Sequence, residues 1–265
     1  MAKGDLLIIG GNEDKKENRT ILQKFSSLCL DRKGPIGILT TASGFPEEVG
    51  DEYKQLFQEL HGEEPVLFHL DTREKAECDN LPRRLSELSG LFMTGGDQLR
   101  LTSILGGTCF YKHLIKNWHD GMIVGGTSAG AAVMSRLMIF SSKNLKNAEA
   151  AYLEMGSGFG FLEDVIIDQH FSQRDRFSRL MRAIALNPQI IGVGIDENTA
   201  IWVKNEGELF EVLGEYNVSI FDGKKSVYID IAEKSTTNMT ISDIRFHTLG
   251  EGAIFHLQKR ELILP

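Results

Sequence analysis

A serine in a glycine-rich turn is the first feature of this sequence that could do chemistry. Residues 126–130 (Gly-Thr-Ser-Ala-Gly) fit the Gly-x-Ser-x-Gly pattern of a nucleophile elbow. In such an elbow the serine sits on a tight turn between a strand and a helix, and the glycines leave room for substrate. An apolar run precedes the turn and small residues follow it. The pattern favours Ser128 as a nucleophile over the plainer interpretation of a glycine-rich turn.

A serine hydroxyl is a weak nucleophile, and it needs a base, usually a histidine that a carboxylate orients. Of the seven histidines, His170 is the candidate because it directly follows a strand-like apolar segment. Asp196 and Glu197 follow the next such segment, although paired carboxylates there are also typical of a cap or a turn. Ser128, His170 and Glu197 would form a triad. The α/β-hydrolases have the order serine, acid, histidine, so a generic esterase is disfavoured.

The tetrahedral intermediate of such a reaction needs backbone N–H donors, which form an oxyanion hole. One donor is expected from Ala129, directly after the serine. The second is expected from the glycine pair 95–96, with Gly96 as the candidate. The alternative for this pair is an ordinary glycine turn.

Three arginines follow His170 closely, at positions 174, 176 and 179. Arginine binds carboxylates through two parallel hydrogen bonds, so these side chains could recognise an acidic substrate. Arg176, Arg179 and Arg182 would share a helical face, with Arg174 in the first turn nearest the site. The plainer interpretation is a solvated helix face with salt bridges.

The elements that must position these residues alternate between short apolar runs and amphipathic stretches, which predicts an α/β fold with a parallel sheet and helices on both faces. Ligands of such sheets bind beyond the carboxyl ends of the strands, so the candidate residues would share one edge. Short strands from residue 199 onward predict antiparallel hairpins. The polar and glycine-rich residues 141–160 predict a long loop near the site. The predicted strands are 6–9, 35–40, 65–70, 91–94, the elbow strand, 164–168 and 190–195, and the predicted helices are 15–30, 46–60, two pieces within 71–88, 98–105, 110–119 and 174–186.

Composition narrows the class of protein. The chain has 265 residues, of which 42% are hydrophobic and 25% charged, as in ordinary globular proteins. We expect residues 1–265 to form a single α/β domain. The net charge of −8 argues against nucleic-acid binding, and no apolar run is long enough to span a membrane. Three scattered cysteines and the absence of a signal-peptide pattern indicate a cytoplasmic protein without disulfides or a zinc site.

Taken together, these motifs resemble the cyanophycinases, which belong to the serine peptidase family that also contains dipeptidase E, the aspartyl dipeptidase. The similarity extends over nearly the whole chain with the same order and spacing. The segments that carry it are Gly95-Gly96-Asp97-Gln98, Gly125 to Gly130, Asp168-Gln169-His170-Phe171 with the arginines after it, and Asp196-Glu197.

The resemblance implies a three-layer fold like that of the class I glutamine amidotransferases, with C-terminal antiparallel strands. It implies Ser128 as the nucleophile, His170 as the base and Glu197 as the orienting acid, with no metal or organic cofactor. It also implies a homodimer that releases β-Asp-Arg dipeptides from cyanophycin, a poly-aspartate with arginine on each β-carboxyl. The residues implied to line the substrate pocket are Gln98, Asp168, Gln169, Arg174, Arg176 and Arg179.

Two alternatives stay open at this point. One is an α-aspartyl dipeptidase of the same family. The other is a protein that binds a ligand on the same scaffold without catalysis. The arginine pattern favours the polymer, and the complete set of triad candidates weighs against a non-catalytic protein. We expect Asp168 to pair with a guanidinium of the substrate, and the arginines to pair with its α-carboxylates. The basic and glycine-rich pattern expected in residues 141–160 is diluted.

Overall fold

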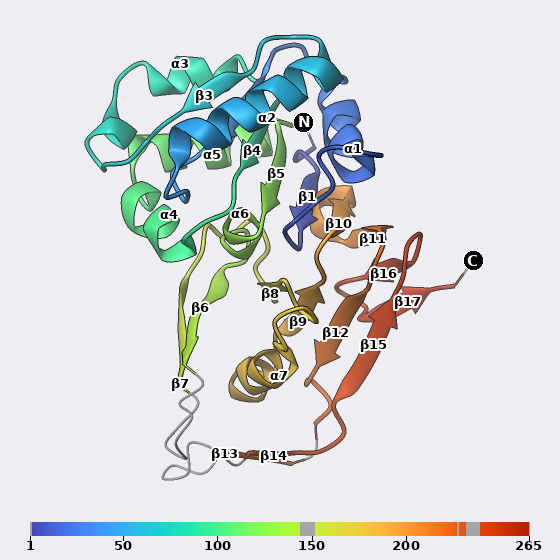
Figure 1. Ribbon diagram of the computed structural model, residues 1–265. Helices are drawn as coiled ribbons and strands as arrows, with labels where there is room; N and C mark the ends of the chain where they lie inside the picture. The colour runs from blue at the N-terminus through green and yellow to red at the C-terminus, as the bar shows by residue number, and fades with distance from the viewer. Residues whose placement is uncertain (1, 144–151, 227, 232–238, 265) are drawn as a thin grey trace.

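A nine-stranded sheet is the largest element of the computed structural model, which describes residues 2–143, 152–226, 228–231 and 239–264 (Figure 1). Its strands lie in the order β17 (Glu261–Ile263), β16 (Ile254–His256), β11 (Leu209–Gly214), β10 (Thr199–Lys204), β1 (Leu6–Ile9), β5 (Ile123–Thr127), β4 (Gly90–Met93), β2 (Ile36–Leu39) and β3 (Val66–Phe68). The strands from β1 to β3 are parallel, and β10, β11, β16 and β17 continue the sheet in antiparallel fashion.

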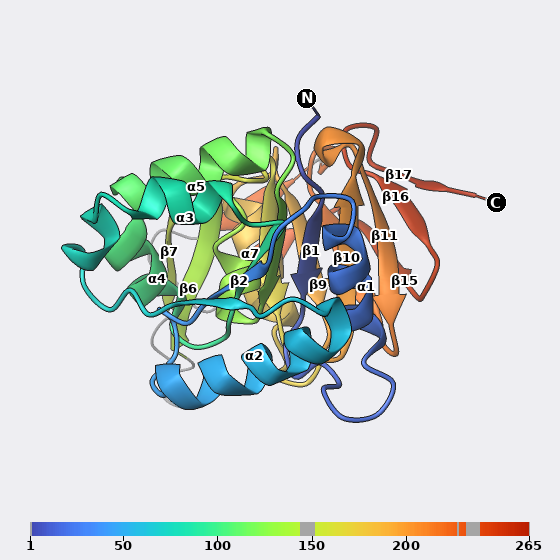
Figure 2. The ribbon, with the colours of Figure 1, turned by 90° about the horizontal axis from the view of Figure 1, so that it is seen from above.

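Helices cover both faces of the parallel part, as predicted (Figure 2). On one face lie α1 (Thr20–Cys29) and α2 (Pro46–His61), and on the other lie α3 (Leu81–Ser86), α4 (Gln98–Leu105) and α5 (Cys109–His119). Alternate residues of a strand point to opposite faces. In β1, accordingly, Leu7 and Ile9 pack with α1 and α2, and Leu6 and Ile8 pack with α3 to α5. Burial of apolar side chains on both faces therefore fixes β1 at the centre.

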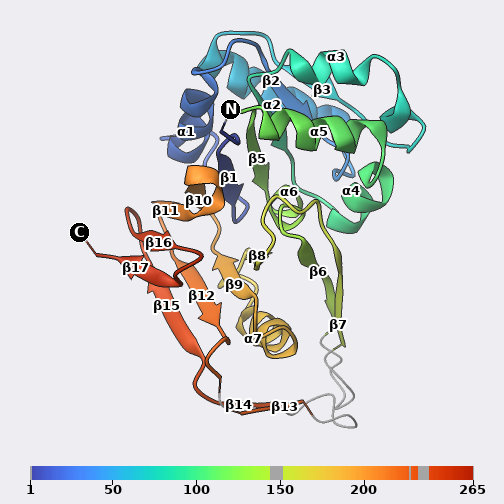
Figure 3. The same cartoon turned by 180° about the vertical axis from the view of Figure 1, so that it is seen from behind.

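The strands that precede His170 and Glu197 belong to a second sheet, and the prediction that they continue the first sheet is wrong. The second sheet has the order β15 (Arg245–Leu249), β12 (Val218–Asp222), β9 (Ile191–Ile195) and β8 (Val165–Gln169). Only β8 and β9 are parallel to each other among these described strands. Helix α7 (Phe177–Leu186) packs on one face of this sheet through Leu180 and Ile184 (Figure 3). The opposite face joins the main core.

The segment predicted as a long loop at 141–160 contains strand residues instead. β6 (Leu137–Lys143) pairs with β7 (Tyr152–Ser157) in antiparallel fashion, and residues 144–151 lie outside the described ones. Leu153 and Met155 alternate along β7 and pack on the α7 cluster, which explains why this polar segment forms a strand. A further antiparallel pair is formed by β13 (Ile229–Ile231) and β14 (Met239–Ile241).

Two helices begin later than predicted. α1 begins at Thr20 because the Asp14 carboxylate accepts hydrogen bonds from the backbone N–H groups of Lys16, Glu17 and Arg19, which holds a turn. α7 begins at Phe177, so Arg174 lies in the preceding turn rather than in the first helical turn. Region 71–88 contains two helical pieces, η1 (Lys75–Glu77) and α3, and Pro82 lies in the first turn of α3. Another short 3-10 helix, η2, covers Asn205–Gly207.

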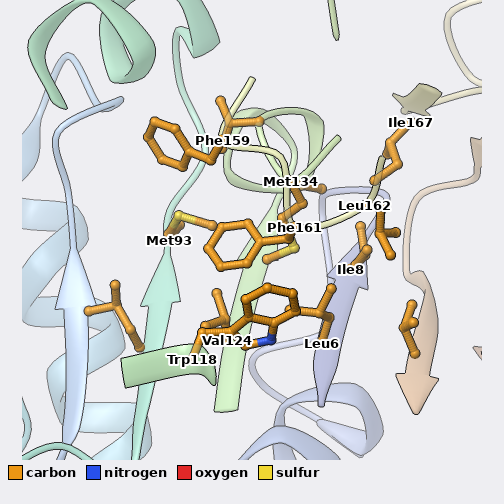
Figure 4. Close-up of a cluster of buried hydrophobic side chains, with 14 of the residues drawn as sticks. Leu6, Ile8, Met93, Trp118, Val124, Met134, Phe159, Phe161, Leu162 and Ile167 are labelled. Atoms are coloured by element: carbon orange, nitrogen blue, oxygen red, sulfur yellow. The ribbon is translucent and has the colours of Figure 1, made fainter. Parts of the chain in front are cut away.

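The nucleophile elbow rests on the main hydrophobic core. Figure 4 shows Val124 from β5 and Met134, just beyond the elbow, in the same buried cluster as Trp118 and Phe161. Each of these four side chains is at most 5% exposed. The strand before the elbow and the chain after it are therefore both held by packing. No helix among the described residues has the length and apolarity needed to cross a bilayer.

Candidate active site

Ser128 occupies a strained turn between β5 and α6 (Ala129–Ala132). Its φ and ψ angles are 52° and −108°, a backbone conformation that costs a non-glycine residue on the order of 1–3 kcal/mol. A Cβ on Gly126 would overlap the Gly130 backbone, and a Cβ on Gly130 would overlap the carbonyl oxygen of Met93. The glycines of the motif are thus needed for β4, β5 and α6 to approach closely enough to form the elbow.

Three side chains from different parts of the sequence form a hydrogen-bonded chain at this elbow. Ser128 Oγ lies 2.8 Å from His170 Nε2, and His170 Nδ1 lies 2.6 Å from Glu197 Oε1. His170 directly follows β8, and Glu197 is the second residue after β9. Because β8 and β9 are parallel and in register to their ends, both side chains leave the sheet at the same edge. The structure therefore brings together the three residues that the sequence proposed as a triad.

The surroundings of His170 favour the neutral imidazole, the form that can accept a proton. Burial lowers the pKa of His170 below its ordinary value of 6.5, the hydrogen bond to Glu197 opposes this effect, and the positive charge of Arg174 adds to it. For Glu197, burial raises the pKa, but hydrogen bonds from His170 and Asn12 outweigh it and leave the pKa below its ordinary value of 4.5. At neutral pH the pair is therefore a neutral histidine beside an ionised carboxylate.

Asp196, which the sequence left beside Glu197 as a second carboxylate, faces another way. Its carboxylate accepts hydrogen bonds from the backbone N–H groups of Ser172 at 2.9 Å and Asn217 at 3.3 Å. Asp196 is 6% exposed and joins the turn after β8 to the start of β12. It therefore holds the loops that carry His170 and Glu197.

The segment after β1, residues 10–12, contacts both the base and the acid. The carbonyl oxygen of Gly10 accepts a hydrogen bond from the backbone N–H of His170 at 2.8 Å. Gly11 lies directly beside the His170 ring, since a Cβ there would overlap the imidazole. Asn12 donates from Nδ2 to Glu197 Oε2 at 3.1 Å. No motif marks an asparagine for such a position, so only the structure reveals this contact.

Behind the nucleophile lies a buried polar cluster that sequence reasoning missed. Glu13 is 5% exposed, and its Oε2 accepts a hydrogen bond from Thr127 Oγ1 at 2.6 Å, while the Tyr53 hydroxyl donates to its Oε1. Burial raises the pKa of Tyr53 well above 10, and the adjacent Glu13 raises it further. The phenol therefore stays protonated and donates to the carboxylate. Because Thr127 directly precedes Ser128, this cluster anchors the strand end that carries the serine.

The two predicted oxyanion donors lie at the elbow. Ala129 is the first residue of α6, where backbone N–H groups have no partner within a helix. The glycine pair 95–96 follows β4 and passes beside Ser128, since a Cβ on Gly95 would lie 3.3 Å from the serine Cβ. Gly96 has φ 141°, and a Cβ there would overlap the carbonyl oxygen of Ala42. Their roles in catalysis stay predictions.

On one side of Ser128 lies a pocket of about 550 Å³ that contains the arginines. Gln98 and Gln169 line it, together with Arg174, Arg176 and Arg179. Arg174 is exposed, and its guanidinium has no partner among the described residues. Gln98 donates to the carbonyl oxygen of Ile139 at 3.0 Å.

Asp168 lies beneath these arginines and does not line the pocket. It is 1% exposed, and Arg179 Nε donates to its Oδ2 at 2.7 Å, while Arg176 approaches its Oδ1 at 3.3 Å. Arg176 also donates to the Gln169 side chain at 2.9 Å. The expectation that Asp168 pairs with a substrate guanidinium is therefore wrong for this arrangement, because the protein's own arginines occupy the carboxylate. Three arginines and one carboxylate, Asp175, line the pocket, so its charge is net positive.

A second pocket of about 640 Å³ lies on the other side of Ser128, beneath the segment after β1 and beside α2. Its lining includes Glu13, Glu52, Tyr53 and His170. The serine thus stands between a cationic pocket and one of mixed charge. Within the described residues, no group of three or more histidine, cysteine, aspartate or glutamate side chains is arranged to hold a metal ion.

The serine lies on a strained elbow at the carboxyl end of a strand of an α/β sheet. It is hydrogen-bonded to a histidine, which is hydrogen-bonded to a glutamate. This arrangement defines a serine hydrolase site. Comparison with known proteins identifies the family within this class. Residues 6–210 match the model of peptidase family S51, and the chain belongs to that family. It is therefore a serine-type peptidase.

Known cyanophycinases align with nearly the full length of the chain. A cyanophycinase from Synechococcus elongatus is 36% identical over 269 aligned residues, which cover 99% of this chain and 83% of the relative. A cyanophycinase from Nostoc sp. is 35% identical, with coverage of 98% and 88%. A solved structure of a peptidase from an acI-B1 actinobacterium is 23% identical with a TM-score of 0.65, covers 90% of this chain and 96% of its own, and shows the same fold.

Proposed function

We propose that this protein is a cyanophycinase, a cytoplasmic serine exopeptidase that hydrolyses cyanophycin to β-Asp-Arg dipeptides. The observation that supports it most is that a Ser128–His170–Glu197 chain with hydrogen-bond distances of 2.8 and 2.6 Å stands beside an arginine-lined pocket, in a member of family S51. The relatives that match nearly the whole chain carry the name cyanophycinase. A homodimer is part of the proposal, from the family resemblance.

In the proposed mechanism, His170 accepts the proton of Ser128 while Oγ attacks the scissile carbonyl. The N–H groups of Ala129 and Gly96 stabilise the oxyanion, and Glu197 holds the imidazole and stabilises its charged form. His170 then gives its proton to the leaving amine. Water, deprotonated by the same histidine, hydrolyses the acyl-enzyme and restores the serine.

The positive charge of the pocket matches the carboxylates of cyanophycin. Cyanophycin carries carboxylates at the α-position of each attached arginine and at the end of its backbone. Guanidinium groups bind such carboxylates through two parallel hydrogen bonds. We assign this role to Arg174, whose guanidinium has no partner among the described residues, and to Arg176 and Arg179, which line the same pocket. Asp168 supports these arginines from below.

The test is incubation of purified protein with cyanophycin granules, followed by mass spectrometry of the soluble products. We expect β-Asp-Arg from the wild-type protein and at least a thousandfold less from Ser128→Ala, because removal of a triad member costs on the order of 10⁴ or more. Undiminished dipeptide release by Ser128→Ala would overturn the proposal. Hydrolysis of α-linked Asp-X dipeptides with no action on the polymer would instead identify an α-aspartyl dipeptidase.

A further inference from the structure

Glu197 needs more than one anchor to orient His170. Its side chain is 24% exposed and stands on an irregular loop after β9. A glutamate has one more rotatable bond than an aspartate, so a single hydrogen bond to histidine leaves its carboxylate free to turn. Both of its oxygens are engaged here: Oε1 lies 2.6 Å from His170 Nδ1, and Oε2 accepts from Asn12 Nδ2 at 3.1 Å.

Asn12 is itself held in place by the backbone around it. The carbonyl oxygen of Gly11 accepts a hydrogen bond from the Asn198 N–H at 2.9 Å, and the N–H of Asp14 donates to Asn198 Oδ1 at 2.8 Å. These two bonds tie the segment after β1 to the loop that carries Glu197. Asn12 has φ 47°, a conformation that asparagine tolerates better than most residues. Its amide is therefore presented to Glu197 from a fixed position.

We propose that Asn12 is a positioning residue of the triad, which fixes the second carboxylate oxygen of Glu197 and through it the orientation of His170. The inference rests on the proposed roles of Ser128, His170 and Glu197. The hydrogen bond of the Asn12 amide goes to Glu197, so its effect on the base is indirect. It replaces, in this glutamate triad, the rigidity that a shorter acid would have by itself.

Other charged groups also act on the His170–Glu197 pair, and the test leaves these groups unchanged. Arg174 and Arg176 face His170 and oppose its protonation, and Glu197 favours it. Two substitutions at position 12 change this balance in opposite directions. Asn12→Asp adds a negative charge beside Glu197 and favours the imidazolium. Asn12→Gly removes the amide and keeps the backbone conformation, which alanine would strain, so Glu197 is less well held and favours the imidazolium less.

The experiment measures the rate at which a fluorophosphonate labels Ser128 between pH 4.5 and 9, which requires no knowledge of the natural substrate. We expect both variants to label about 10–100 times more slowly at the plateau, the loss expected for one hydrogen bond to a charged group. We also expect the acid limb of the profile to move to lower pH in Asn12→Gly and to higher pH in Asn12→Asp. A residue with only a structural role would change thermal stability and leave this limb in place.

Asn198→Gly is the matched control, since it removes another hydrogen bond between the same two segments at a residue with the same φ of 47°. We expect it to lower the melting temperature and to move the acid limb much less than Asn12→Gly does, because the backbone bond from Asn198 N–H to the Gly11 carbonyl oxygen still holds the two segments together. Labelling of Asn12→Gly at the wild-type rate, or an equal shift of the limb in Asn198→Gly, would overturn the inference. If the wild-type protein is not labelled, or Ser128→Ala still is, the proposed function fails and the inference fails with it.

Discussion

Replacement of Asp168 by asparagine should destabilise the fold and disturb the arginine pocket together. Asp168 is 1% exposed and lies between Arg176 and Arg179, whose side chains are 12% and 14% exposed. Burial lowers the pKa of Arg176 to about 10, with the carboxylate of Asp168 opposing this effect and the charge of Arg179 adding to it. Without the carboxylate, two largely buried guanidinium groups lie side by side and lose the negative charge that offsets their repulsion.

The magnitude follows from this burial. Removal of one partner from a buried ion pair costs about 3–5 kcal/mol, a large part of the roughly 5–15 kcal/mol that stabilises a typical protein. At about 2–4 °C per kcal/mol for a chain of this size, the melting temperature should fall by about 6–20 °C. The arginines should also move apart, which raises KM for a substrate whose carboxylates they bind more than it lowers kcat.

Differential scanning calorimetry and steady-state kinetics of Asp168→Asn test both effects. Asp222→Asn is the matched control, because Asp222 is 6% exposed and pairs with Arg260 away from Ser128. It should lower the melting temperature comparably and leave kcat/KM unchanged. The double variant Asp168→Asn/Arg179→Gln should recover part of the stability, since it removes one of the opposed charges. An unchanged melting temperature and KM in Asp168→Asn would refute this reasoning.

Three further predictions concern the triad and its support. Since the pKa of His170 lies below 6.5 and its neutral form is the base, kcat/KM should be at its plateau above that pH and fall to half at a lower one; a midpoint above 6.5 in a pH–rate profile would contradict this. Gly11→Ala should lower kcat at least a hundredfold in steady-state assays, because its Cβ would overlap the His170 ring, and wild-type turnover would argue against that contact. Tyr53→Phe should cost about 1–3 kcal/mol in urea unfolding, because the buried Glu13 carboxylate loses a donor; a cost near zero would argue against this bond.

Local patterns sufficed to predict much of the fold and the candidate residues of the site. The elbow around Ser128 is encoded in five consecutive residues, because Gly126 is required by the Gly130 backbone in the same turn and Gly130 by the neighbouring strand β4. His170 and Glu197 could be selected because each follows an apolar run, and parallel strands end at a common edge. The helix at 98–105 was predicted to its bounds, since Asp97 caps it and the apolar spacing is regular.

The predictions that failed concern contacts between residues that are far apart in the sequence. Nothing in the apolar run 191–195 shows that it pairs with β8 and β12 in a second sheet, because β10 takes the place beside β1. The partner of Asp168 was misjudged for a similar reason. A carboxylate near arginines can bind a ligand or the arginines themselves, and only burial distinguishes the two. Asn12 carries no signal at all, since its role arises from the approach of two loops that are 185 positions apart.

The division of the site between two sheets links activity to the way those sheets are held together. Ser128 follows β5 of the nine-stranded sheet, whereas His170 and Glu197 follow β8 and β9 of the four-stranded one. At the site the short segment after β1 helps to join the halves, because it continues a strand of the nine-stranded sheet and bonds to the loops that carry His170 and Glu197. A relative displacement of about 1 Å is enough to cost a reaction two orders of magnitude. A ligand, a partner subunit or a substitution that shifts one sheet against the other would therefore switch the enzyme off while both sheets stay folded.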